Sequence, residues 1–192
     1  MRKTKKKYIS AEEFYISSIK LGKMVYDSGF KPDFLIALWR GGSFPGCIVQ
    51  EYLKFHNIKT DHVAIRTCGR KTDNSIKKKI EVHAVDYALS KLNENKKLLI
   101  IDDIFDSGLT LQEVLKVLKR KLKKRGKNMP KETKIAVVYY KPKKNQTEIE
   151  PDFYVKETDD WIILPHEFAG LSCREIVSNK GKKLRKFFNK EL

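Results

Sequence analysis

Residues 98–120 read LLIIDDIFDSGLTLQEVLKVLKR and contain the strongest structural pattern in the chain. Aliphatic residues lead into Asp102 and Asp103, as in a core strand that ends at the protein surface. After a turn that contains Asp106, apolar side chains recur every three or four residues from about Thr110, which predicts a helix with one buried face. That face would hold Leu111, Val114, Leu115, Leu118 and Leu122. The stretch therefore predicts a strand, a turn that carries three carboxylates, and a helix.

The rest of the chain alternates between similar strands and helices. Further buried strands are expected at residues 33–39, 61–67 and 133–140. Helices are expected at residues 10–30, 47–55 and 83–92, the first opened by a capping box of Ser10 and Glu13. Because the strands are almost continuously apolar, we expect an α/β fold with a parallel sheet covered by helices on both faces. Ligands of such sheets bind at the carboxyl ends of the strands, so the turn Arg40-Gly41-Gly42 should share a crevice with Asp102.

Composition narrows the class of protein. The formal charge of +17 predicts attraction to polyanions, although lysine-rich solvated surfaces are common, so nucleic-acid binding stays an alternative. Three cysteines without CxxC spacing favour a reducing, cytoplasmic location, and four histidines without HxxxH spacing make a histidine-based metal site unexpected. No apolar run approaches the roughly 18 residues of a membrane span. The basic N-terminus is not followed by the apolar segment of a signal peptide. We expect a flexible basic arm at residues 1–7, a single domain at 8–180 and a basic tail at 181–192.

The three carboxylates suggest a ligand with two chemically different ends. Asp102 and Asp103 can accept hydrogen bonds from a vicinal diol, or hold Mg²⁺ together with a ligand. The residues DSGLT (106–110) resemble a phosphate cradle, because Gly108 lets the backbone approach an anion at a helix N-terminus. A diol at one end and a phosphate at the other describe a ribose 5-phosphate. The alternative is an ordinary polar helix cap, which would need only one such residue.

These motifs resemble those of the type I phosphoribosyltransferases. The segment LLIIDDIFDSGLT (98–110) is similar to the family's phosphoribosyl-pyrophosphate signature, and LIALWRGGSFPG (35–46) to its pyrophosphate loop. The segments YYKP (139–142) and WIILPHE (161–167) resemble the 6-oxopurine branch, near the hypoxanthine and xanthine-guanine enzymes. The four motifs occur in the family's order.

The resemblance implies a role for each matching residue. Asp102 and Asp103 would bind the ribose hydroxyls, and Mg²⁺ would be held by Asp103 and Asp102, with Glu167 near it. Asp106 would be the catalytic acid or base beside purine N7. The 5-phosphate would bind Ser107, Gly108, Leu109 and Thr110, and pyrophosphate would bind Arg40 and Gly41. Lys141 would donate to the purine O6, and Trp161 and Ile162 would contact the purine ring. The family usually has a cis peptide at the position of Trp39–Arg40.

The activity implied is purine salvage, in which ribose 5-phosphate passes from phosphoribosyl pyrophosphate to hypoxanthine, guanine or xanthine. The resemblance also implies a homo-oligomer and a small hood over the base site, built mainly from residues 141–175. Residues 68–79 lack apolar periodicity and would form a mobile loop that excludes water from the site. Three alternatives stay open: a nucleic-acid-binding regulator on the same fold, a different base such as adenine or orotate, and a binding module without enzymatic activity.

Overall fold

The computed structural model describes residues 6–71 and 78–188, which divide into two compact units. The larger unit covers residues 17–159, and the smaller one combines residues up to Ile16 with those from Asp160 onward. The smaller unit is therefore assembled from both ends of the chain. A hood over the base site, built mainly from residues 141–175, remains a prediction.

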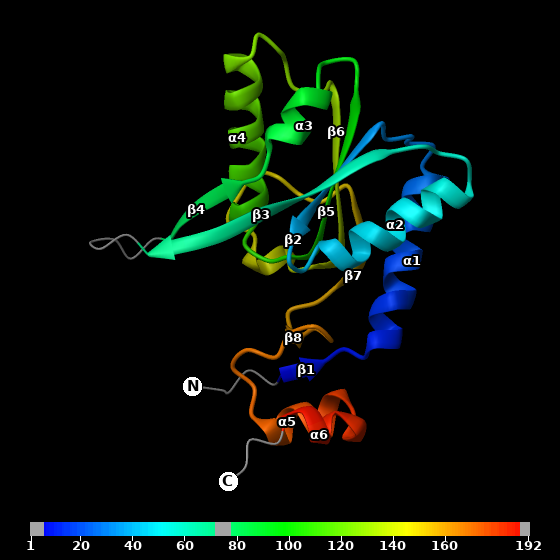
Figure 1. Cartoon of the computed structure of the whole chain (residues 1–192), viewed down its shortest axis with the longest axis vertical. Coiled ribbons are helices and arrows are strands. Elements are labelled where there is room, and N and C mark those ends of the chain that lie inside the picture. Colours follow the sequence, from blue (N-terminus) through cyan, green and yellow to red (C-terminus); the bar gives the residue numbers. More distant parts are fainter. Residues whose placement is uncertain (1–5, 72–77, 189–192) are drawn as a thin grey trace. The chain divides into compact units, whose positions relative to one another are not determined.

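A six-stranded sheet with the order β4-β3-β2-β5-β6-β7 forms the centre of the larger unit (Figure 1). The strands are β2 (Phe34–Trp39), β3 (Asp61–Lys71), β4 (Lys78–His83), β5 (Lys97–Phe105), β6 (Glu132–Tyr140) and β7 (Phe153–Glu157). All neighbouring strands are parallel except β4, which is antiparallel to β3. The predicted α/β fold with a mostly parallel sheet is confirmed.

Helices cover both faces of this sheet (Figure 1), as expected for apolar parallel strands. They are α1 (Ala11–Asp27), α2 (Ser43–Phe55), α3 (Asp86–Lys91) and α4 (Leu109–Lys124), with a short 3₁₀ turn η1 (Pro142–Lys144). The buried face of α4, with Leu111, Val114 and Leu118, packs with α3 and the sheet in one apolar core. The start of α1 follows the predicted cap, since the backbone N–H of Glu13 donates to Ser10 Oγ at 3.0 Å.

Two strand assignments from the sequence were incomplete. Residues 68–79 were expected to form a loop, but β3 continues to Lys71 and pairs with β4 from Lys78 onward. The middle of that expected loop, residues 72–77, lies outside the described residues. Strand β7 was also missed within the polar stretch 141–160. Edge strands such as β4 and β7 can be polar because fewer of their side chains face the core, so apolar periodicity does not reveal them.

The smaller unit contains a two-stranded parallel sheet and short helices. Its elements are β1 (Lys6–Tyr8), β8 (Trp161–Ile163), α5 (Cys173–Lys180), η2 (Lys182–Leu184) and α6 (Arg185–Phe188). Glu175 on α5 accepts hydrogen bonds from Lys6 Nζ at 2.7 Å and from Tyr8 Oη at 3.0 Å. Residues 6 and 7 of the expected basic arm therefore belong to a strand that pairs with β8, and Lys6 has a carboxylate partner; residues 1–5 lie outside the described residues.

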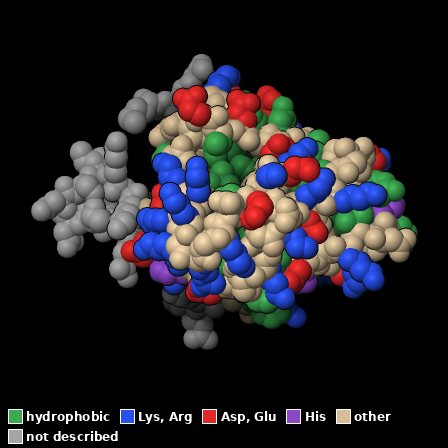
Figure 2. Space-filling model, turned by 90° about the horizontal axis from the view of Figure 1, so that it is seen from above, with side chains coloured by type: hydrophobic (Ala, Val, Ile, Leu, Met, Phe, Trp, Pro, Cys, Tyr) green, Lys and Arg blue, Asp and Glu red, His purple; other side chains and the backbone are tan. Residues whose placement is uncertain are grey.

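Positive charge is spread over the surface of the larger unit. The outward face of α4 exposes Lys116, Lys119, Arg120, Lys123 and Lys124, as the helical pattern predicts. Figure 2 shows many Lys and Arg side chains spread over the face in view, with Asp and Glu side chains among them. In the described part of the chain, no helix has the length and hydrophobicity needed to cross a membrane.

Candidate active site

The acidic motif lies where β5 loses one of its two neighbours. Pairing with β2 ends at Ile101, opposite Ala37, whereas pairing with β6 continues to Phe105. The strand predicted to end at Asp102 thus runs three residues further, since β6 is long enough to continue the ladder. Asp102 and Asp103 therefore lie at the carboxyl end of the sheet, beyond the last residue that β2 pairs, and both are partly buried.

The glycine turn after β2 packs directly against these two aspartates. A Cβ atom added to Gly41 would lie 1.8 Å from Asp103 Oδ2, and one added to Gly42 would lie 2.8 Å from the Cα of Asp102. Both distances are far below van der Waals contact. At Gly42 the close atoms are backbone, so only glycine fits there, whereas a side chain at Gly41 would displace the carboxylate of Asp103. The peptide bond Trp39–Arg40 before this turn is cis, as the family resemblance implied. The turn and the acidic motif, distant in sequence, therefore form one site at the carboxyl ends of β2 and β5.

The two neighbouring carboxylates are electrostatically unfavourable without a ligand. Burial raises the pKa of Asp102 well above its ordinary value, and the negative charge of Asp103 raises it further. Backbone N–H groups of Asp103 and Gly42 act in the opposite direction on the pKa of Asp102. The backbone N–H of Asp103 donates to Asp102 Oδ1 at 2.9 Å, which fixes that side chain. Such a pair favours a ligand that brings hydroxyl donors or a cation.

The turn after β5 forms a small cavity at the start of α4. Its volume is about 70 Å³, and its lining includes Asp102, Asp106, Ser107, Gly108 and Thr110. Gly108 has a φ of +75°, a conformation that other residues rarely adopt, and α4 begins directly after it. Backbone N–H groups at a helix N-terminus favour a bound anion, so this cavity has the chemistry of a phosphate site.

Two residues that sequence reasoning missed hold this turn in place. A Cβ atom added to Gly108 would lie 2.4 Å from Thr147 Oγ1 and 2.8 Å from Asn145 Oδ1. Thr147 Oγ1 in turn donates to Asn145 Oδ1 at 2.8 Å, and the backbone N–H of Gln146 donates to the Ser107 carbonyl at 3.0 Å. An Asn two residues before a Thr is a local signal for a turn in which the Asn side chain accepts hydrogen bonds from the Thr. Nothing local indicated that this turn would pack against Gly108.

Lys141 is a buried lysine next to the acidic motif. It follows β6, has a relative exposure of only 5 %, and its Nζ lies 3.7 Å from Asp106 Oδ2. Its backbone N–H donates to the Phe105 carbonyl at 2.9 Å, which ties the end of β6 to the end of β5. A buried ammonium is costly unless it has partners, so Lys141 is not an ordinary solvated lysine.

The other predicted site residues, Trp161, Ile162 and Glu167, belong to the smaller unit. Trp161 on β8 is half-exposed, whereas Ile162 is buried. Glu167 closes a local turn, because its Oε2 accepts from the backbone N–H of Leu164 at 2.8 Å. Their roles toward a base and a metal stay predictions.

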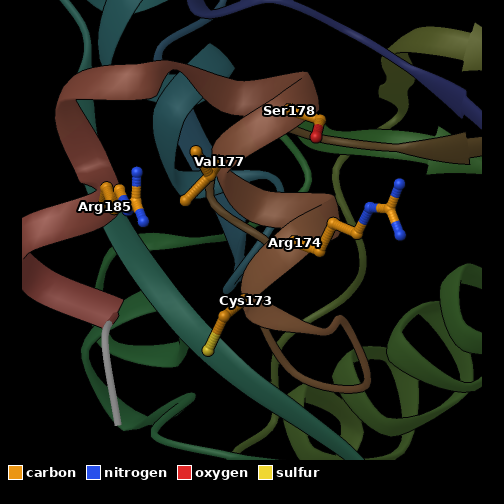
Figure 3. Close-up of a pocket in the computed structure, with 5 residues that line it drawn as sticks. All are labelled: Cys173, Arg174, Val177, Ser178 and Arg185. Carbon is orange, nitrogen blue, oxygen red and sulfur yellow. The ribbon is translucent and has the colours of Figure 1, made fainter. Parts of the chain in front are cut away.

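A separate cavity of about 260 Å³ in the smaller unit contains none of the predicted site residues. It is lined by Cys173, Arg174, Val177, Ser178 and Arg185. Figure 3 shows the guanidinium groups of Arg174 and Arg185 extending in different directions, so they do not converge on a common anion.

Comparisons with known proteins agree with this geometry. Residues 6–172 match the model of the phosphoribosyl transferase domain. A purine phosphoribosyltransferase from Pyrococcus horikoshii is 26% identical with a TM-score of 0.63, covering 86% of this chain and 97% of its own. A comparison with curated proteins gives no significant match.

Two further structures share the fold at lower identity. A hypothetical protein from Neisseria gonorrhoeae, solved with bound ppGpp, is 20% identical with a TM-score of 0.72, covering 98% of this chain and 100% of its own. The xanthine-guanine-hypoxanthine phosphoribosyltransferase of Helicobacter pylori is 24% identical with a TM-score of 0.60, covering 83% and 92% of the two chains. Because the family model matches most of the length of this chain, the chain belongs to the phosphoribosyltransferase domain family.

Proposed function

We propose that this protein is a phosphoribosyltransferase that moves ribose 5-phosphate from phosphoribosyl pyrophosphate to a 6-oxopurine, releasing pyrophosphate. The observation that carries the choice of base is the buried Lys141, whose ammonium lies 3.7 Å from Asp106 beside the acidic motif. An ammonium group can only donate hydrogen bonds, so it complements a carbonyl oxygen and not an amino group. The 26% identical purine enzyme is consistent with this choice.

The larger unit offers a complementary place for each part of phosphoribosyl pyrophosphate. The 5-phosphate would occupy the cavity at the start of α4, where Ser107, Gly108, Leu109 and Thr110 lie. The ribose hydroxyls would donate to Asp102 and Asp103. The pyrophosphate would bind the turn of Arg40 and Gly41, which packs against the same carboxylates.

The acidic motif also fits a magnesium ion, which the family resemblance implies. Mg²⁺ prefers carboxylate oxygens and binds through one or two of them plus substrate oxygens. Asp103 and Asp102 present two adjacent carboxylates. Burial and then the negative charge of Asp103 raise the pKa of Asp102, and a divalent cation would offset both effects. When bound, the ion would neutralise charge on the pyrophosphate leaving group. Glu167 is a further proposed contributor.

The chemistry requires the bond from ribose C1 to pyrophosphate to break as purine nitrogen attacks C1. Arg40 would stabilise the negative charge that grows on the departing pyrophosphate, an electrostatic contribution made mainly in the transition state. Asp106 would accept or donate the proton at purine N7, and its half-exposed side chain leaves it accessible to a base. Lys141 would hold O6, and Trp161 and Ile162 would contact the ring.

A panel of bases tests this proposal. Purified protein with phosphoribosyl pyrophosphate and Mg²⁺ should form nucleotide from hypoxanthine, guanine or xanthine, and far less from adenine or orotate. The double variant Asp102→Ala/Asp103→Ala should lose binding of phosphoribosyl pyrophosphate in calorimetry. Asp159→Ala, which removes a surface carboxylate paired with Lys143, is the matched control and should bind normally.

Two outcomes would decide against the proposal. Adenine or orotate as the preferred substrate would contradict the role of Lys141. No transfer to any base, together with a salt-dependent shift of RNA or DNA in gels, would favour the nucleic-acid-binding alternative, to which the reported comparisons give no support. A homo-oligomer and a cytoplasmic location also remain predictions.

A further inference from the structure

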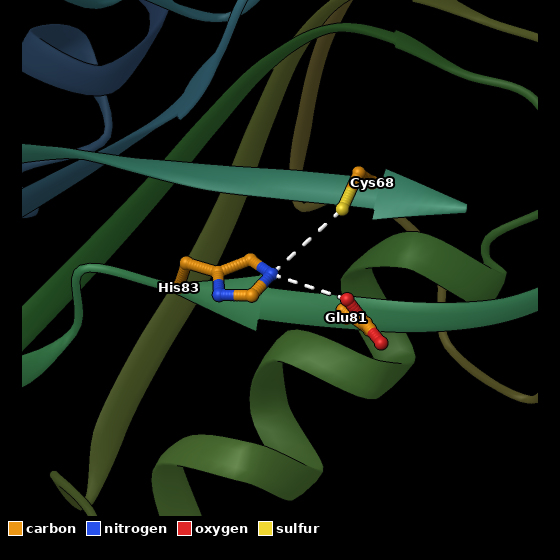
Figure 4. A group of neighbouring side chains, drawn as sticks. All are labelled: Cys68, Glu81 and His83. Atoms are coloured by element: carbon orange, nitrogen blue, oxygen red, sulfur yellow. Dashed lines mark hydrogen bonds and ion pairs between the residues drawn. The ribbon is translucent and has the colours of Figure 1, made fainter. Parts of the chain in front are cut away.

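Three side chains of the types that bind metals lie close together on the hairpin of β3 and β4, outside the site described above. Cys68 on β3 pairs with Glu81 on β4, and His83 lies two residues beyond Glu81 on the same strand. Side chains of paired residues share a face of the sheet, as do residues two apart in a strand. The antiparallel register thus places one sulfur, one carboxylate and one imidazole side by side (Figure 4).

The spacing of the three donor atoms is close to that of a tetrahedral metal site. His83 Nε2 lies 3.8 Å from Cys68 Sγ and 3.4 Å from Glu81 Oε2, and all three donors lie within 4.8 Å of one another. With usual Zn–S, Zn–N and Zn–O bond lengths, tetrahedral angles require separations of about 3.6 Å for sulfur to nitrogen and about 3.4 Å for nitrogen to oxygen. Small side-chain rotations would therefore suffice to close the site around one ion.

The donor types select the class of metal. Thiolate and imidazole are ligands for zinc and similar borderline-soft ions, whereas Mg²⁺ prefers oxygen alone. Arg66 pairs with His83 and adds a positive charge nearby, which opposes a cation, but the thiolate and the carboxylate supply two negative charges. The site is also partly exposed, with 48% of the His83 side chain and 28% of the Glu81 side chain accessible to an incoming ion.

We propose that Cys68, Glu81 and His83 bind one Zn²⁺, with a fourth position left to water. The ion would link β3 to β4 at the edge of the sheet. His83 lies opposite Arg66, which also pairs with Trp39 of β2, and the Cys68–Glu81 pair lies two residue pairs further along the hairpin. This site is independent of the proposed magnesium site, since the two share no residue, and does not depend on which base the protein uses.

Cobalt spectroscopy provides the test. Untagged, reduced, full-length protein is titrated with Co²⁺, whose coordination by a thiolate gives a near-ultraviolet charge-transfer band, and bound Co²⁺ is then displaced with Zn²⁺. We expect the thiolate band to saturate at one equivalent of Co²⁺, whatever binds at the carboxylates of the proposed magnesium site. Cys68→Ser should abolish the band, and His83→Ala should weaken Zn²⁺ binding by more than the roughly 10–100-fold typical of losing an outer-shell partner.

Matched controls separate this site from other thiols. Cys47→Ser and Cys173→Ser each remove an exposed cysteine elsewhere in the chain and should leave the band and the affinity unchanged. Circular dichroism of each variant verifies that it is folded. A band that persists in Cys68→Ser, an affinity unchanged in His83→Ala, or no saturable Co²⁺ binding to the folded wild type would each overturn the proposal.

Discussion

Replacing Lys141 with Met should reduce discrimination between 6-oxo and 6-amino purines. In the wild type, an adenine amino group would face the buried ammonium, and a desolvated donor without a partner costs about 1–3 kcal/mol. Met has no donor, so the penalty against adenine disappears while the hydrogen bond to O6 is lost. We expect the ratio of kcat/KM for hypoxanthine to that for adenine to fall by about 5- to 150-fold, since about 1.4 kcal/mol equals a factor of ten.

The same substitution should not destabilise the unliganded fold. At 3.7 Å, the attraction between Lys141 and Asp106 is about 1 kcal/mol at the dielectric constant of water and about 4.5 kcal/mol at an effective constant of 20. The half-exposed Asp106 side chain places the pair near the lower value. Burying an ammonium costs several kcal/mol, so Met, of similar length, should leave the free energy of unfolding unchanged or raise it.

Steady-state kinetics with each base and urea unfolding test both statements. Lys143→Met is the matched control, because Lys143 is two residues away, highly exposed and paired with Asp159. It should leave the base preference and the stability close to those of the wild type. If Lys141→Met kept the wild-type preference between hypoxanthine and adenine, the contact to O6 would lie elsewhere and the reasoning would be wrong.

Three other substitutions probe the carboxylates. Asp106→Asn should slow transfer by about 10²–10⁴-fold in single-turnover kinetics while calorimetry shows unchanged binding of phosphoribosyl pyrophosphate; unchanged turnover would remove Asp106 from the mechanism. Because the pKa of Asp102 is raised in the fold, its charge costs stability as pH rises above about 3.8, so Asp102→Asn should resist urea better than the wild type at pH 7 but not at pH 3. Hydrogen bonds from Lys6, Ser172 and Tyr8 lower the pKa of Glu175 from 4.5 to about 2. The ionised Glu175 therefore stabilises the fold above pH 4.5, and this stabilisation is lost as the pH falls toward 2. Glu175→Gln should therefore unfold more easily than the wild type at pH 7, with a difference that shrinks in acid, and a constant difference across this range would contradict the assignment.

The sequence by itself determined those features that depend on neighbouring residues. The aliphatic run before Asp102 and the periodic face of α4 are local patterns and occur as predicted, whereas Asp102 and Asp103 lie within β5 and only Asp106 lies in the turn before α4. Gly108 adopts a positive φ because its position in the turn demands it, which is also a local property. The order of strands and helices followed from the same patterns, and with it the fold class.

The tertiary structure decided which distant residues meet. The register of β2 against β5 sets Gly41 against Asp103, and the end of β6 buries Lys141 beside Asp106. No local pattern separates a buried lysine from an exposed one before a proline, because burial depends on what the other strands place around it. The same is true of Cys68 and His83, whose spacing along the chain gives no metal motif and which meet only because β3 and β4 pair antiparallel.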